Sequence, residues 1–186
     1  MCGAVSRYKV SYQICIMKSK PIICISKCLL GECCRYNAEI LPSPFSTQQF
    51  KQLSSMCQLL PFCPEVAAGM PTPRPPLHLV QDATLISICS ENQDYTIELL
   101  QAAEGFLSMS GGLAGAILKE KSPSCGISGS KIYEKSYQGP QNKRGEGIFT
   151  TLLSQKYEGI PMISEKSWQD SLAVSDFLSN IGLSTL

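Results

Sequence analysis

Cysteine is the residue type that says most about chemistry in this sequence of 186 residues, which contains 10 cysteines. Three of them, Cys28, Cys63 and Cys125, each come just after a short apolar segment typical of a β-strand. Because the carboxyl ends of parallel strands meet at one edge of a sheet, where ligands bind, these thiols are expected to meet there. Three protein ligands leave a fourth position on a metal open, as catalysis requires. The pattern alone equally allows three small buried side chains.

The other cysteines give a weaker pattern. No Cys-x-x-Cys motif occurs, which argues against zinc ribbons, thioredoxin-like redox sites and ferredoxin-type clusters. Cys33 and Cys34 are adjacent, and such a pair in a loop could bind a metal, become oxidised or do neither. Core positions are expected for the cysteines inside apolar stretches, which are Cys15, Cys24, Cys57 and Cys89.

Composition excludes several classes of protein. Hydrophobic residues make up 44% and charged residues 17%, which is incompatible with a disordered chain. The net charge of +1 gives no basic excess for nucleic acid, and no apolar run is long enough to cross a membrane. The single histidine, His78, removes most hydrolytic triads and every two-histidine metal site. The first residues do not resemble a signal peptide, so we expect a cytoplasmic protein with reduced cysteines, which favours metal binding or catalysis.

The elements that must position these cysteines alternate between strands and helices. Strand-like segments are expected at residues 21–26, 59–63, 77–81, 84–90, 115–118 and 160–164, and helices at 46–57, 95–109, 147–157 and 165–181. This alternation predicts an α/β fold: a layered, Rossmann-like domain with a mainly parallel sheet flanked by helices and the site at the C-terminal strand ends. Among the residues at helical spacing, Ile97 and Leu172 are expected to face the core.

The remaining segments are expected to lie outside this pattern. Residues 1–20 are predicted to be an N-terminal extension, with Met17 as an alternative start of translation, and residues 21–186 to form the single domain. Residues 70–77 contain four prolines and are expected to cross the surface in an extended conformation. The polar residues 137–145 predict a mobile loop that covers the site.

Five segments resemble, in the same order, motifs of the DUF523 family, which includes the iron–sulfur-dependent thiouracil desulfidases. They are SKCLLGECCRY (Ser26–Tyr36), PFCPEVAAGMPTPRPP (Pro61–Pro76), AILKEKSPSCG (Ala116–Gly126), IY (Ile132–Tyr133) and MISEKSW (Met162–Trp168). The motifs are long and ungapped, and together they span about residues 21–170. On these motifs the chain is identified as a member of that family.

The resemblance implies an enzyme that removes sulfur from thiolated, thiouracil-like nucleobases without net redox change and releases hydrosulfide. It implies that Cys28, Cys63 and Cys125 hold a 4Fe–4S cluster, whose fourth iron has no protein ligand and binds the substrate sulfur. A Lewis-acidic iron would polarise the thiocarbonyl group, and a soft sulfur ligand suits that iron. The expected partner is therefore a small thiolated base, and neither nucleic acid nor a membrane.

Polar residues of the same motifs are expected to complete the catalytic site. Glu65 is a candidate to activate water or to protonate the departing group, and Ser122 to hydrogen-bond the substrate. Each residue also has a structural interpretation. Glu65 could be a carboxylate at a helix N-terminus, and Ser122 a turn or cap residue before Pro123.

Three further residues are candidates for binding the planar base. Tyr36 or a guanidinium such as that of Arg35 could stack on the base, and Arg74 could bind an exocyclic oxygen. Anchoring of the proline-rich segment is an equal interpretation for Arg74. Members of the family commonly continue Arg-Tyr with Asp-Gly, whereas Asn37 and Ala38 follow here. The loop therefore lacks an easy left-handed glycine, although Asn37 tolerates that conformation.

A different class of function stays open beside the enzyme. A protein that binds an iron–sulfur cluster or a metal without turnover, and so senses iron or redox state, would need the three thiols but not Glu65 or Ser122. A third and weaker interpretation is a polyproline ligand for an aromatic groove.

Overall fold

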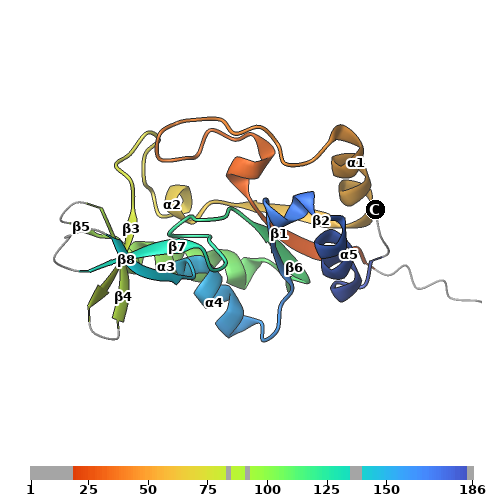
Figure 1. The fold of residues 1–186 in the computed structure, drawn as a ribbon. Coiled ribbons are helices and arrows are strands. Elements are labelled where there is room, and N and C mark those ends of the chain that lie inside the picture. The colour runs from red at the N-terminus through yellow and green to blue at the C-terminus, as the bar shows by residue number, and fades with distance from the viewer. Residues whose placement is uncertain (1–18, 83–84, 91–92, 135–139, 184–186) are drawn as a thin grey trace, which may run out of the picture.

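The computed structural model describes residues 19–82, 85–90, 93–134 and 140–183, which form the two sheets of Figure 1. In the first sheet every pairing is parallel. Its order is β2 (Gln58–Phe62), β1 (Ile22–Ser26), β6 (Gly115–Leu118) and β9 (Met162–Ser164). The predicted N-terminal extension, with Met17, lies outside the described residues except for positions 19 and 20.

Helices cover both faces of the parallel sheet. Successive side chains of β1 point to opposite faces, so Ile23 and Ile25 pack in one core cluster and Cys24 in another. The first cluster includes side chains of α1 (Thr47–Met56) and α5 (Ser171–Asn180), and the second those of α3 (Thr96–Met109) and α4 (Ile148–Lys156). The predicted α/β fold, with a parallel sheet flanked by helices, is confirmed.

The last predicted helix, at residues 165–181, is in fact two elements. A short 3-10 helix, η2 (Ser167–Gln169), is followed by α5, which begins where the Asp170 carboxylate accepts the N–H of Leu172 at 2.9 Å. This N-cap explains the break, because it satisfies a donor that has no partner inside the helix.

Two residues that were expected in the core are exposed. Leu172 is 74% exposed and Ile97 is 67% exposed. Both lie in the first turn of their helices, before the buried stripe starts. In α3 that stripe begins at Leu99, and in α5 at Val174.

The second sheet was not predicted as a separate sheet. Its order is β5 (Gln93–Asp94), β4 (Leu85–Ser90), β3 (His78–Asp82), β7 (Ser130–Glu134) and β8 (Pro140–Gly145), with mixed pairing. In Figure 1 it forms the end of the molecule opposite α1 and α5.

The prediction of a mobile loop at residues 137–145 is wrong for residues 140–145, which form β8 and pair antiparallel with β7. Polar side chains do not prevent this, since an edge strand pairs through its backbone. Residues 137–139 lie outside the described residues. Within the described ranges, no helix is both long and apolar enough to cross a membrane.

Candidate active site

The eight residues that the sequence singled out all line one cavity of about 320 Å³, at the C-terminal end of the parallel sheet. They are Cys28, Cys63, Cys125, Glu65, Ser122, Arg35, Tyr36 and Arg74. The structure therefore brings the first three of the five motif segments together, as the rule for parallel strand ends predicts.

Each of the three cysteines follows one of three neighbouring strands. Strand β1 leads into the 3-10 helix η1 (Lys27–Leu30), which carries Cys28. Strand β2 ends one residue before Cys63, which is the N-cap residue of the short helix α2 (Pro64–Ala67). Cys125 lies in the loop after β6. Since β2, β1 and β6 are adjacent in the sheet, the three loops meet at its edge.

Helix α4 anchors the loop that carries Cys125. Backbone N–H groups of residues 147–149 donate to the carbonyl oxygens of Gly126, Pro123 and Ser124 at 2.7, 3.1 and 2.9 Å. The Thr150 hydroxyl donates to the Cys125 carbonyl at 2.9 Å. The loop carbonyls therefore accept hydrogen bonds from the first N–H groups of α4, which have no acceptor inside the helix. A Cβ on Gly147 would lie 2.4 Å from the Ser124 carbonyl carbon, so this close approach requires glycine.

The structure separates the two members of the Cys33–Cys34 pair. Cys33 is exposed, and its thiol donates to the Ala38 carbonyl at 3.4 Å. Cys34 is buried and lines the cavity beside the three other thiols. Hydrogen bonding with the Cys28 thiol raises the pKa of Cys34 to about 11, although hydrogen bonding with Cys63 acts in the opposite direction. Four thiols, rather than three, therefore face this cavity.

Two further thiols are held in the neutral form. Hydrogen bonding with Cys34, and then burial, raise the pKa of the Cys63 thiol. Burial raises the pKa of Cys125 more than any other cause, the neighbouring Cys63 raises it further, and hydrogen bonding with Ser26 opposes both. Each thiol must therefore lose a proton before it can bind a metal as thiolate.

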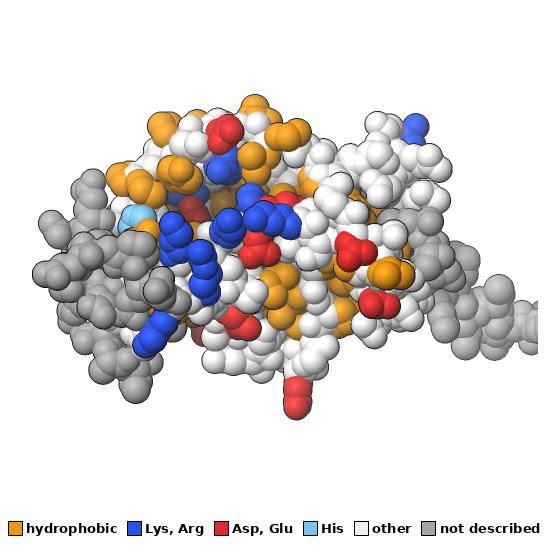
Figure 2. All heavy atoms as spheres, viewed as in Figure 1, with side chains coloured by type: hydrophobic (Ala, Val, Ile, Leu, Met, Phe, Trp, Pro, Cys, Tyr) orange, Lys and Arg blue, Asp and Glu red, His pale blue; other side chains and the backbone are white. Residues whose placement is uncertain are grey.

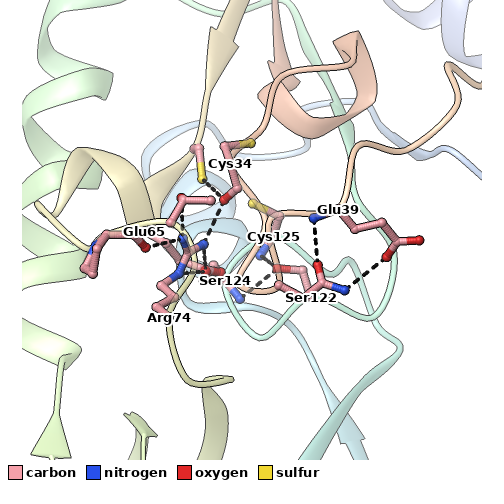
Figure 3. Close-up of polar contacts among 11 residues, drawn as sticks. Cys34, Glu39, Glu65, Arg74, Ser122, Ser124 and Cys125 are labelled. Carbon is pink, nitrogen blue, oxygen red and sulfur yellow. Dashed lines mark hydrogen bonds and ion pairs between the residues drawn. The ribbon is translucent and has the colours of Figure 1, made fainter.

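Glu65 is held by an arginine on one side and a serine on the other (Figure 3). Its Oε2 accepts from Nε of Arg74 at 2.9 Å and also from Nη2. Its Oε1 accepts from the hydroxyl of Ser124, which is fully buried, at 2.8 Å. The carboxylate thus links helix α2 to the Cys125 loop. It lies in the first turn of α2, as the structural interpretation required, and it also lines the cavity.

The remaining N–H groups of Arg74 bind protein oxygens. Nη1 donates to the Pro71 carbonyl at 3.0 Å and to the Thr72 hydroxyl at 3.1 Å, while Nη2 donates to the Cys34 carbonyl at 2.9 Å. With the two bonds to Glu65, all five donors of the guanidinium are used, and the side chain is only 2% exposed. Of its two interpretations, the geometry favours anchoring of the proline-rich segment over contact with a substrate.

Ser122 has both acceptor positions occupied. Its Oγ accepts the backbone N–H groups of Ser124 at 3.2 Å and of Cys125 at 3.1 Å. A hydroxyl has two acceptor lone pairs and one donor proton, so only the proton is left to bind a molecule in the cavity. The turn interpretation and the substrate interpretation of Ser122 are therefore compatible.

Arg35 and Tyr36 form part of the wall. The Arg35 guanidinium makes an ion pair with Glu39 and lies 5.9 Å from the centre of the Tyr36 ring, which is 41% exposed. In the adjoining turn Ala38, rather than Asn37, takes the left-handed conformation, with φ of 56°. Ala38 stands where members of the family commonly have glycine, and it adopts the left-handed conformation that glycine adopts most easily.

The cavity is rich in cationic side chains. Lys27, Arg35, Lys119 and Lys121 line it, and Lys119 makes an ion pair with Glu165. Figure 2 shows Lys and Arg side chains gathered over the middle of the face that it presents. Such a surface favours anionic groups in the cavity.

Sequence reasoning missed Ser26 and Ser124 as parts of this site. Ser124 stands between two residues that were singled out, in the motif SPSC, and this position was its one signal. The expected core positions of Cys24 and Cys57 are confirmed, since both are buried; Cys89 is half-buried, and Cys15 lies outside the described residues.

The fold and the cavity define an α/β protein whose candidate active site is built from thiols at the ends of parallel strands. The chain belongs to the 2-thiouracil desulfurase family, whose model matches residues 23–166. It is similar to the uncharacterized protein YbbK of Bacillus subtilis (strain 168), with 31% identity over 160 residues, which are 81% of this chain and 100% of YbbK. It is also similar to the solved structure of the [4Fe-4S]-dependent thiouracil desulfidase TudS (DUF523Vcz). The identity is 36% and the TM-score 0.63, over 85% of this chain and 99% of that one.

Proposed function

We propose that this protein is a desulfidase that hydrolyses the C–S bond of thiolated nucleobases such as thiouracil, with a 4Fe–4S cluster held by Cys28, Cys63 and Cys125. The observation that carries the proposal is the meeting of these three thiols with polar donors and acceptors in one cavity. Its volume of about 320 Å³ has to hold the cluster together with the base.

The donor set fits an iron–sulfur cluster better than a single metal ion. The candidate ligands are all thiols, which are the usual ligands of such clusters. Among the residues that the structure describes, no three His, Cys, Asp or Glu side chains are placed to hold one metal ion. In a four-iron cluster each cysteine binds a different iron, so its thiols surround a larger volume than the ligands of one zinc ion.

When bound, the cluster would supply a Lewis-acidic iron that polarises the thiocarbonyl group of the base. The protein's own residues would bind and orient the base. The hydroxyl of Ser122 can donate its proton to a ring nitrogen or exocyclic oxygen while its Oγ accepts the N–H groups of Ser124 and Cys125. The exposed ring of Tyr36 offers a flat surface for the base to stack on. The cationic lining favours the anionic hydrosulfide that forms.

Glu65 would act on the water that replaces sulfur. The guanidinium of Arg74 pairs with an ionised carboxylate, and an ionised carboxylate can accept a proton but cannot donate one. This pairing supports a role for Glu65 as the group that orients water and takes its proton. It speaks against Glu65 as the group that protonates the departing sulfur. Arg74 and Ser124 fix the direction of the carboxylate and act through it.

The proposal is tested by iron, sulfide and activity measurements after strictly anaerobic purification and reconstitution. We expect about four iron and four sulfide per chain, and release of hydrosulfide from 2-thiouracil. Cys28→Ala, Cys63→Ala and Cys125→Ala should each lose the cluster, whereas the control Cys89→Ala should keep it. Full cluster loading in all three variants would refute the ligand assignment.

A second set of variants separates the enzyme from a sensor. Glu65→Gln and Ser122→Ala should keep the cluster and lose hydrosulfide release. If both variants release hydrosulfide like the wild type, these residues have no catalytic role.

A further inference from the structure

The cavity contains a fourth thiol that the proposed function leaves without a role. Cys34 is 5% exposed and lines the cavity together with the three proposed ligands. The thiol of Cys63, one of those ligands, lies within hydrogen-bonding distance of the Cys34 backbone. By contrast Cys24 and Cys57, the other buried cysteines among the described residues, are absent from the cavity lining.

The backbone of Cys34 is fixed on both sides of its side chain. Its N–H donates to the Glu32 carbonyl at 2.9 Å. Its carbonyl accepts from Arg74 Nη2 at 2.9 Å and from the Cys63 thiol at 3.9 Å. A cysteine whose backbone is held in this way can still move its sulfur by rotation about one side-chain bond. These bonds fix the backbone of Cys34 at the cavity wall and do not involve its sulfur.

We propose that Cys34 is an exchangeable fourth ligand, whose thiolate binds the iron that the three other cysteines leave open and gives way to the substrate sulfur. This inference rests on the proposed function. In the exchange one iron–sulfur bond to Cys34 breaks and one to the substrate forms, and the released thiolate takes a proton from water. No electron is transferred. The Cys34 thiolate would therefore shield this iron from oxygen and hydroxide until a thiolated base displaces it.

The test compares anaerobically reconstituted wild type with Cys34→Ala and with Cys33→Ala as the matched control. Cys33 is the adjacent but exposed thiol. The probe is sodium hydrosulfide, and its binding is followed by the electron paramagnetic resonance signal of the reduced cluster. An internal ligand that occupies the open iron nine-tenths of the time weakens external binding about tenfold. We therefore expect Cys34→Ala to bind hydrosulfide about tenfold more tightly than wild type, and Cys33→Ala to be unchanged.

A second readout is the loss of the open iron on oxidation. With ferricyanide, Cys34→Ala should lose one iron per cluster several times faster than wild type, since the capping thiol is gone. Cys34→Ser repeats both measurements with a side chain of almost the same size.

The outcomes separate the inference from the function on which it rests. Equal hydrosulfide affinity and equal iron loss in wild type and Cys34→Ala, with four iron in each, would overturn the capping role and leave the desulfidase intact. Loss of the whole cluster in Cys34→Ala would make Cys34 a permanent ligand and would overturn exchange. No iron in the wild type, or no hydrosulfide released from 2-thiouracil, would overturn the proposed function and the inference with it.

Discussion

Replacement of Arg74 by methionine should destabilise the protein strongly, because the guanidinium joins three parts of the site. Its donors bind the Cys34 carbonyl, the proline-rich segment and Glu65, whose side chain is 13% exposed. Arg74→Met keeps most of the side-chain volume but leaves the Glu65 carboxylate buried with Ser124 as its one remaining hydrogen-bond partner among those described. Removal of one partner of a buried ion pair typically costs about 3–5 kcal/mol.

The measurement is urea unfolding of the cluster-free protein under reducing conditions, followed by circular dichroism. A loss of about 3–5 kcal/mol is a large part of the ~5–15 kcal/mol that usually holds a domain together. The control is Arg35→Met, which breaks the pair with Glu39, a side chain that is 56% exposed. Exposed pairs contribute about 0–1 kcal/mol, so the control should unfold close to the wild-type midpoint.

A double-mutant cycle tests the cause. Glu65→Gln removes the charge that Arg74→Met leaves uncompensated, so the double variant should be more stable than the sum of the two single effects by at least about 1 kcal/mol. If Arg74→Met costs no more than Arg35→Met, or if the two single effects simply add, the buried pair does not hold the loops together and the reasoning fails.

Three further predictions concern the loops around the cavity. Ala38→Gly should raise the free energy of unfolding by up to about 1 kcal/mol in the same urea assay, because relief of the left-handed alanine outweighs the extra chain entropy of glycine; no gain would mean that the turn is unstrained. Gly147→Ala should lower stability by about 1–3 kcal/mol and reduce iron loading, since the new Cβ meets backbone, whereas the control Gly105→Ala, with open space around its Cβ, should be neutral or stabilising. The stability advantage of cluster-free wild type over Cys34→Ser should shrink by about 1.4 kcal/mol per pH unit between the unfolded pKa of 9.0 and the folded pKa of about 11. The sign follows because a raised pKa means that the folded chain holds the proton more tightly, so this contribution is complete below pH 9.0 and lost as the pH rises. A constant difference across that window would contradict the contact between Cys34 and Cys28.

The meeting of Cys28, Cys63 and Cys125 could be predicted from the sequence, because it needs only short apolar strands and the rule that parallel strands end at one edge. The cover of helices on both faces followed in the same way from the alternation of elements. The side-chain partners could not be predicted. Whether the guanidinium of Arg74 faces a substrate or a protein carbonyl depends on where the loop of Cys34 passes, and nothing local to Arg74 encodes that path.

The second sheet was missed for a similar reason. Strand β8 has few apolar side chains, so its conformation is decided by backbone pairing with β7 and leaves no periodic pattern in the sequence. Ile97 and Leu172 have the apolar type and spacing of core residues, and only the start of the buried stripe in each helix shows that they lie one turn too early.

The origin of the thiols in three neighbouring parallel strands has a consequence for how the protein matures in the cell. Parallel strands pair only after the chain between them has crossed over the sheet, so the cavity does not exist in a nascent or unfolded chain. In a zinc finger the ligands are close in sequence and the metal drives folding. On the proposed ligand assignment the order is reversed, because the chain must complete its sheet before the three thiols can bind one cluster. The occupancy of the site in a growing cell then reports how well cluster supply keeps pace with newly folded protein.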